Sequence, residues 1–208
     1  MAAPLADDAT STARTPAPAP GPDCGPDAWR LAPADVEGSP AFEAGLTALA
    51  TRCGQTVESV RREARTYLAE LRTAHVPWVY ARVVAAGRRL VASGYERIDY
   101  DDAQVTRLRG LLARRPAVVL ASHRSYLDGG ALTVGFAERG LPPLTVFAGA
   151  NMAFWPIGTI WRRANAVFIR RSRASPVYAY ALRHVVGSLI ERRRPLQWFL
   201  EGTRSRSG

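Results

Sequence analysis

From about residue 95 onward, short apolar runs alternate with segments that carry helix signals, and this alternation restricts the possible folds most strongly. Pro116 opens the run Ala117–Ala121, which is typical of a buried strand. Further strands are predicted at 144–147, 166–169 and 196–200, and helices at 102–115, 127–139 and 177–193. Asp102 can cap the first of these helices. The pattern predicts an α/β fold with a mainly parallel sheet flanked by helices.

The preceding part of the chain, residues 39–94, is predicted to be a helical N-terminal subdomain. Ser39 can cap a first helix whose opening residue is a proline, and Thr56 can cap a second with apolar and arginine side chains on opposite faces. A third predicted helix completes the subdomain. We therefore expect three parts: a disordered, proline-rich leader at 1–38, this subdomain, and an α/β domain at 95–208.

The charge of the chain is unevenly distributed. All 28 basic residues are arginine, and with 18 acids they give a net charge of +10. Residues 129–208 alone hold 12 of the arginines against 3 acids. Such an excess suits nucleic acid, an anionic membrane or an acidic ligand. The two cysteines form no Cys/His cluster, which excludes a disulfide scaffold and a zinc domain and favours a reducing compartment.

Polar side chains follow the first predicted strand, where open α/β sheets tend to bind ligands. His123 and Asp128 are separated by four residues across a strand-to-helix turn. That spacing can fold the carboxylate back onto one imidazole nitrogen, which leaves the other nitrogen to take a proton as a general base. The alternative is an Asp that caps the helix beside a His facing solvent.

Two further predicted strands end in basic residues. The last strand leads to Gly202, which permits close backbone approach, and to Arg204, whose guanidinium can bind a phosphate. The strand at 166–169 delivers Arg170 and Arg171 at its carboxyl end. Each cluster alone is typical of a solvated basic face, but three clusters at strand ends favour a binding site.

Three motifs, in order, carry a family resemblance: HRSYLD, GANMAFWPIGTIWRRANAVFIRR and FLEGTRSRSG. The region from Tyr95 to Gly208 resembles the bacterial membrane-associated glycerol-3-phosphate 1-O-acyltransferases, whose relatives include the dihydroxyacetone-phosphate acyltransferases. The resemblance implies a glycerolipid acyltransferase-like fold. It also implies transfer of an acyl chain from acyl-CoA or acyl carrier protein to the sn-1 hydroxyl of glycerol 3-phosphate, which gives lysophosphatidate for phospholipid biosynthesis.

The resemblance also implies roles for individual residues. His123 would be the general base and Asp128 its orienting carboxylate. The second motif, ending at Phe168, Ile169 and Arg171, is associated with the acyl acceptor, and Arg204 of the third is a phosphate ligand. The residues implied to bind substrate are Arg170, Arg171, Glu201, Gly202 and Arg204. The reaction requires no metal or cofactor and no covalent acyl-enzyme.

The chain departs from the family pattern in two places. The family's second block, which is the last part of the second motif (165–171), usually opens with glycine, and here Asn165 takes that place. Asn tolerates positive φ, so we expect the backbone turn to be kept. The family also continues well beyond the third motif. We therefore expect the chain to be the N-terminal portion of an enzyme, with an incomplete sheet and little or no activity alone.

Several alternatives stay open at this point. The acceptor could instead be lysophosphatidate or dihydroxyacetone phosphate, or the chain could be a non-catalytic basic module that binds anionic lipid. Nucleic acid is not expected as a partner, because no recognisable reading motif is present. Arg162, Arg163 and 192–194 are expected to face anionic headgroups or the acidic acyl carrier. The expected location is peripheral, on the cytoplasmic face of the cell membrane.

Overall fold

The computed structural model describes residues 30–125, 127–170 and 175–199. Within these residues, four strands form one parallel sheet in the order β1-β4-β2-β3. The strands are β1 (Val118–Ala121), β2 (Thr145–Gly149), β3 (Ala166–Ile169) and β4 (Leu196–Phe199). Four residues predicted to bind substrate lie outside the described residues: Arg171, Glu201, Gly202 and Arg204.

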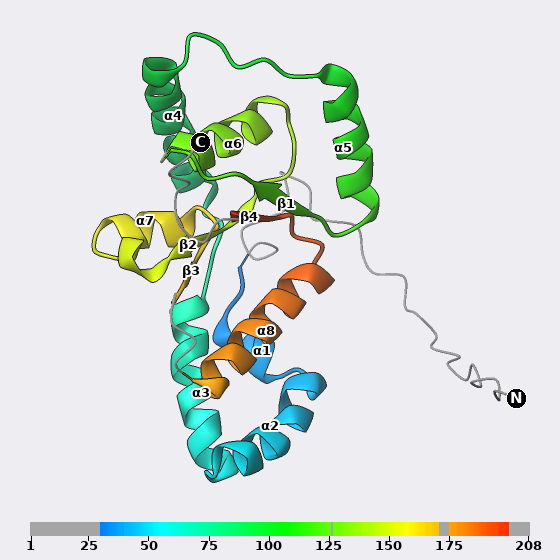
Figure 1. Ribbon diagram of the computed structural model, residues 1–208, viewed down its shortest axis with the longest axis vertical. Coiled ribbons are helices and arrows are strands. Elements are labelled where there is room, and N and C mark those ends of the chain that lie inside the picture. Colours follow the sequence, from blue (N-terminus) through cyan, green and yellow to red (C-terminus); the bar gives the residue numbers. More distant parts are fainter. Residues whose placement is uncertain (1–29, 126, 171–174, 200–208) are drawn as a thin grey trace, which may run out of the picture.

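Helices cover both faces of the sheet (Figure 1). One face carries α1 (Pro33–Glu37), α2 (Pro40–Cys53), α3 (Val57–Leu71) and α8 (Pro176–Glu191). The other carries α4 (Pro77–Gly94), α5 (Asp102–Arg114) and α6 (Leu127–Glu138). A 3₁₀ turn, η2 (Ala150–Met152), and α7 (Ile157–Arg163) connect β2 to β3 and lie at the side of the sheet. The predicted α/β fold with a parallel sheet is confirmed.

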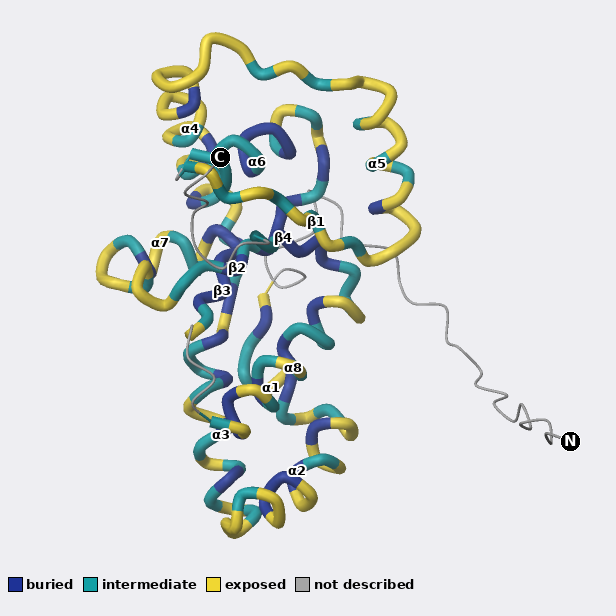
Figure 2. The backbone as a smooth tube through the Cα atoms, viewed as in Figure 1, coloured by how far each residue is buried: buried dark blue, intermediate teal, exposed yellow. Residues whose placement is uncertain are grey.

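The larger core joins the N-terminal helices to the sheet through α8. Helix α3 packs along α8. Phe42 of α2 and Leu68 of α3 are at most 1% exposed. They belong to the same hydrophobic cluster as Phe147 of β2 and Leu196 of β4. Figure 2 shows these buried segments facing one another. Full burial of such side chains stabilises the fold by about 1.5–3 kcal/mol each. The N-terminal helices and one face of the sheet therefore share one core.

Helix starts follow the sequence signals closely, with one correction. Ser39 and Thr56 each accept a hydrogen bond from the backbone N–H three residues on, at 3.2 Å, as predicted. Asp102 does not cap α5. Asp101 does so, accepting from the N–H groups of the second and third residues that follow it. Asp102 instead forms an ion pair with Arg139 at 2.9 Å.

Residues 30–38, predicted to belong to a disordered leader, are ordered. The Leu31 N–H donates to the carbonyl of Thr73 at 3.0 Å, and Pro33 opens the short helix α1. Leu31 and Val36 are each only 2% exposed and belong to the larger core. Burial of these two apolar side chains stabilises the segment, although its proline-rich composition is typical of disorder.

Strand β1, predicted to be buried, is an edge strand with one exposed row of side chains. Val118 and Leu120 are 51% and 58% exposed. They pair with Leu196 and Trp198, so they lie on the face that α8 covers, but at its uncovered margin. An apolar run shows that a strand exists, but it does not show whether that strand lies at the edge.

No helix among the described residues combines the length and apolar character needed to cross a bilayer.

Candidate active site

The loop that bears His123 leaves the carboxyl end of β1 and leads directly into α6. The last residue of β1, Ala121, is paired with Phe199, the last residue of β4. His123 therefore lies at the edge of the sheet where two neighbouring parallel strands end together. This is the edge at which open α/β sheets bind their ligands.

Asp128, in the first turn of α6, holds this loop in shape. Its Oδ2 accepts hydrogen bonds from the backbone N–H groups of Arg124 and Ser125, both at 2.7 Å. Its Oδ1 accepts from the Ser125 hydroxyl at 3.0 Å, and the same hydroxyl oxygen accepts from the Leu127 N–H. Burial favours the neutral carboxyl, but the hydrogen bonds from Ser125 and Arg124 outweigh it, so the pKa of Asp128 is lowered.

The same carboxylate faces His123. The Nδ1 of His123 lies 3.8 Å from Oδ2 of Asp128, within ion-pair range but beyond an ordinary hydrogen bond. Both side chains are about one-fifth exposed. Asp128 faces the imidazole, as the first interpretation requires. The alternative is not met, because Asp128 bonds N–H groups that precede α6 and His123 does not face solvent. With Nδ1 directed at the carboxylate, Nε2 is the ring nitrogen on the far side.

A third residue, Phe199, fixes the plane of the imidazole and was not singled out from the sequence. Its ring stacks on that of His123, with centroids 4.3 Å apart and planes 24° apart. Gly129 of α6 faces the same ring, where a Cβ would make an ordinary van der Waals contact at 3.5 Å. The available signal was positional: Phe199 is the first residue of the third motif.

The structure does not bring Arg170 to His123. Arg170 follows β3, which is three strands away from β1, or roughly 14 Å at the usual strand spacing. Its guanidinium forms two hydrogen bonds to the Glu70 carboxylate, at 2.6 and 2.9 Å, and lies over the Tyr67 ring. The hydrogen bond to Glu70 raises the pKa of Arg170. Its role in substrate binding stays a prediction.

Asn165 adopts the positive φ expected of it, at 72°, and its side chain joins a buried polar cluster. Its Nδ2 lies 3.1 Å from Nδ1 of His75, and its Oδ1 accepts from Arg194 at 3.2 Å. Arg194 is fully buried, so the expectation that it faces an anionic headgroup is wrong. Burial, together with the charge of Arg192, lowers the pKa of Arg194 to about 9. Burial, with the charge of Arg194, lowers the pKa of His75.

Among the residues that the structure describes, no group of three His, Cys, Asp or Glu side chains could hold a metal ion.

Comparison with known proteins places this site in context. A family model described as "Acyltransferase" matches residues 102–208, which include β1 to β4 and the His123 loop. The "Putative acyltransferase plsB1" proteins of Mycobacterium tuberculosis H37Rv and Mycobacterium bovis are each 36% identical over 171 residues, covering 80% of this chain. The "Glycerol-3-phosphate acyltransferase" of Histophilus somni is 36% identical over 116 residues, covering 55% of this chain. The aligned region spans 27% of each mycobacterial relative and 14% of the Histophilus protein.

Proposed function

The chain belongs to the acyltransferase family, and on that premise we propose that the protein transfers a fatty acyl chain to the sn-1 hydroxyl of glycerol 3-phosphate. The acyl donor is a thioester, acyl-CoA or acyl carrier protein, and the product is lysophosphatidate. The observation that carries the proposal is the arrangement of His123 and Asp128 on the loop between β1 and α6. The name of the Histophilus relative supports glycerol 3-phosphate as the acceptor.

The chemistry requires little more than a base and correct positioning, because a thioester is already activated. Nε2 of His123 removes the proton from the acceptor hydroxyl while the oxygen attacks the thioester carbonyl. The C–S bond then breaks, and the leaving thiolate takes the proton from the imidazolium. Asp128 stabilises the transient imidazolium by its negative charge, 3.8 Å from Nδ1. Phe199 keeps the imidazole in the plane that this transfer needs.

The acceptor phosphate is assigned to residues of the second and third motifs. In this proposal Arg204 binds the phosphate bidentately, and Arg171, Glu201 and Gly202 complete the acceptor site. The third motif begins at the end of β4, whose last residue is paired with the end of β1. That pairing supports a common site for the base and the phosphate ligand.

We assign the reaction to phospholipid biosynthesis, at the cytoplasmic face of the cell membrane. The acyl product is amphiphilic and leaves most easily into a bilayer. The excess of arginine over acids in residues 129–208 supports an anionic membrane surface as a partner.

The test is an acceptor panel with the full-length protein. Radiolabelled acyl-CoA and acyl carrier protein are offered with glycerol 3-phosphate, dihydroxyacetone phosphate or lysophosphatidate. We expect the highest kcat/KM with glycerol 3-phosphate, and Arg204→Ala should raise the KM for this acceptor at least tenfold, since it removes a charge-assisted phosphate contact. Arg107→Ala, the same change on α5, is the matched control. Preference for another acceptor, or an effect of Arg204→Ala on the thioester alone, would contradict the proposal.

A further inference from the structure

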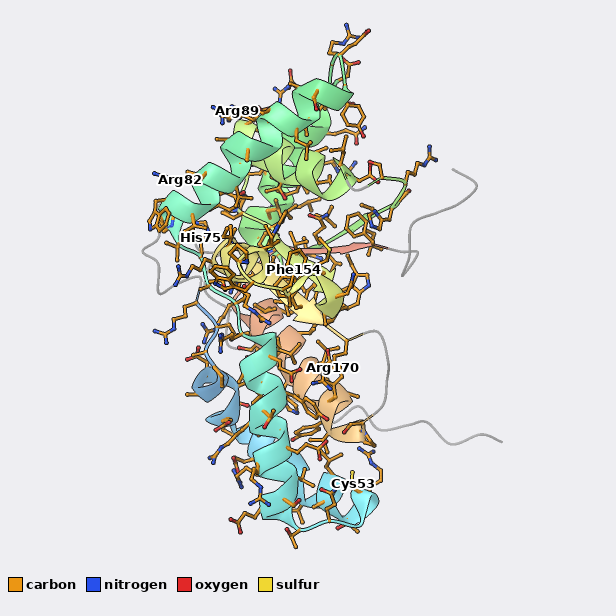
Figure 3. The ribbon with its side chains drawn as sticks, turned by 90° about the vertical axis from the view of Figure 1, so that its left-hand side faces the viewer. Cys53, His75, Arg82, Arg89, Phe154 and Arg170 are labelled. Carbon is orange, nitrogen blue, oxygen red and sulfur yellow. The ribbon has the colours of Figure 1, made fainter. Side chains whose placement is uncertain are left out.

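An open cavity of about 510 Å³ lies beside α7, the helix on the side of the molecule that Figure 3 turns toward the viewer. Its walls come from the chain before α1, from the segment that follows α3, and from α7. Four arginines line it, and no acidic residue does: Arg30, Arg72, Arg162 and Arg163. The volume lies within the roughly 300–1,000 Å³ range of ligand sites, and the lining selects for an anion.

The arginines of this cavity have few acidic neighbours among the described residues, of which Glu70 acts on Arg162. None of its four arginines forms an ion pair with a described carboxylate. Arg162 donates to the main-chain carbonyls of Glu70 and Arg72, while the Glu70 carboxylate is bound by Arg170. Burial, and then the nearby charge of Arg72, lowers the pKa of Arg162. A bound anion would relieve this repulsion.

The segment between two of the lining residues carries strongly exposed apolar side chains. Ala153 and Gly158 line the cavity, and between them Phe154 and Trp155 are 57% and 84% exposed. Ile160 of α7 is 41% exposed. Figure 3 labels Phe154 on this side of the molecule. Two large apolar side chains this exposed, adjacent in the chain and beside a basic cavity, favour an interaction surface.

A further strongly exposed aromatic side chain, Trp78, lies on a neighbouring element. It is 60% exposed in the first turn of α4, with the guanidinium of Arg82 over its ring at 5.5 Å. The start of α4 is tied to the end of α7, because the Val76 N–H donates to the carbonyl of Arg163 at 2.8 Å. Tryptophan and arginine side by side suit the headgroup level of a bilayer, where one part of each side chain is apolar and the other polar.

We infer that this α7 surface, defined as the four-arginine cavity with Phe154, Trp155 and Trp78, binds the phosphate of an anionic phospholipid at a bilayer surface. The inference rests on the proposed function, which acts at a membrane, and it names the part of the molecule that makes the contact. The arginines bind the headgroup phosphate. The aromatic side chains enter the interface beside it. Arg162 and Arg163 precede β3 and so lie toward the amino-terminal edge of the parallel sheet, whereas His123 follows the carboxyl end of β1. The arginine cavity therefore does not occupy the reaction site.

The test measures partition of the full-length protein onto sedimented vesicles. Vesicles of phosphatidylcholine alone are compared with vesicles that also contain phosphatidylglycerol. Arg163→Glu, and separately the pair Phe154→Ser with Trp155→Ser, should each weaken binding to the anionic vesicles about tenfold or more. Arg107→Glu and Leu111→Ser on α5 are the matched controls and should leave binding within about twofold, since α5 lies on the other side of the sheet.

Three outcomes would overturn the inference. Unchanged vesicle binding by the α7 variants would show that another surface makes the contact, or that another part of the protein covers this one. Equal loss with Arg107→Glu would show that only net charge matters. Binding of inorganic phosphate, sensitive to Arg163→Glu, without vesicle binding would show a soluble anion site.

A separate assay keeps this inference distinct from the proposed function. Acyl transfer from a short-chain acyl-CoA to glycerol 3-phosphate, in the absence of vesicles, should be unchanged in the α7 variants. If the unmodified protein shows no transfer, the proposed function fails. The vesicle measurement still decides whether the α7 surface binds anionic lipid.

Discussion

Replacing Asn165 with alanine is expected to destabilise the fold by about 3–5 kcal/mol. Asn165 is fully buried, its φ is 72°, and its side chain bonds to both His75 and Arg194. The hydrogen bond from the guanidinium is worth roughly 1.5–3 kcal/mol because the donor is charged, and the contact with the imidazole roughly 1 kcal/mol. Alanine tolerates left-handed backbone less well than asparagine, which adds about 1 kcal/mol.

Asn165→Gly separates the side-chain effect from the backbone effect. It loses the same two hydrogen bonds but adopts positive φ freely, so it should be about 1 kcal/mol more stable than Asn165→Ala. The assay is equilibrium urea unfolding followed by circular dichroism, with m-values compared among the three proteins. An Asn165→Ala protein within about 0.5 kcal/mol of the unmodified one, or less stable Gly than Ala, would refute this reasoning.

Asp128, His75 and Gly158 each give a further prediction. Asp128→Asn in the full-length protein should lower kcat for acyl transfer roughly 10²-fold, because it removes the charge that faces His123. The circular dichroism spectrum should stay unchanged, and an unchanged kcat would contradict the prediction. His75 has a folded-state pKa below 6.5, so its neutral form should stabilise the fold fully above about pH 6.5. This stabilisation should be lost as the pH falls further. In urea unfolding, His75→Gln should therefore lose less free energy of unfolding at acid pH than the unmodified protein does. Gly158→Ala should destabilise the fold by about 1–3 kcal/mol, since the new Cβ would lie 2.4 Å from the carbonyl oxygen of Ala153; a thermal melt at the unmodified midpoint would contradict that.

Elements with a local signal were predicted well from the sequence. Ser39 and Thr56 mark the starts of α2 and α3 because a capping hydroxyl is visible in the chain itself. The strands β2, β3 and β4 are short apolar runs between helices, and their parallel arrangement follows from that alternation. The geometry of His123 and Asp128 also follows from local spacing, since both lie on one strand-to-helix turn.

Features that depend on contacts distant in sequence could not be predicted. The exposure of Val118 and Leu120 depends on β1 being at the sheet edge, which only the strand order decides. The buried Arg194 donates to the side-chain Oδ1 of Asn165, which lies 29 residues earlier in the chain. The stacking of Phe199 on His123 likewise requires β4 to pair with β1 across 78 residues of sequence.

The central claim is that His123 acts as the base of an acyl transfer, and its replacement in the full-length protein tests this most directly. Transfer of labelled acyl chain from acyl-CoA to glycerol 3-phosphate is measured for the unmodified protein, for His123→Ala, and for His184→Ala on α8 as the matched control. We predict that His123→Ala lowers kcat roughly 10²–10⁴-fold while His184→Ala stays within about threefold of the unmodified rate. Transfer by His123→Ala at the unmodified rate would contradict the account.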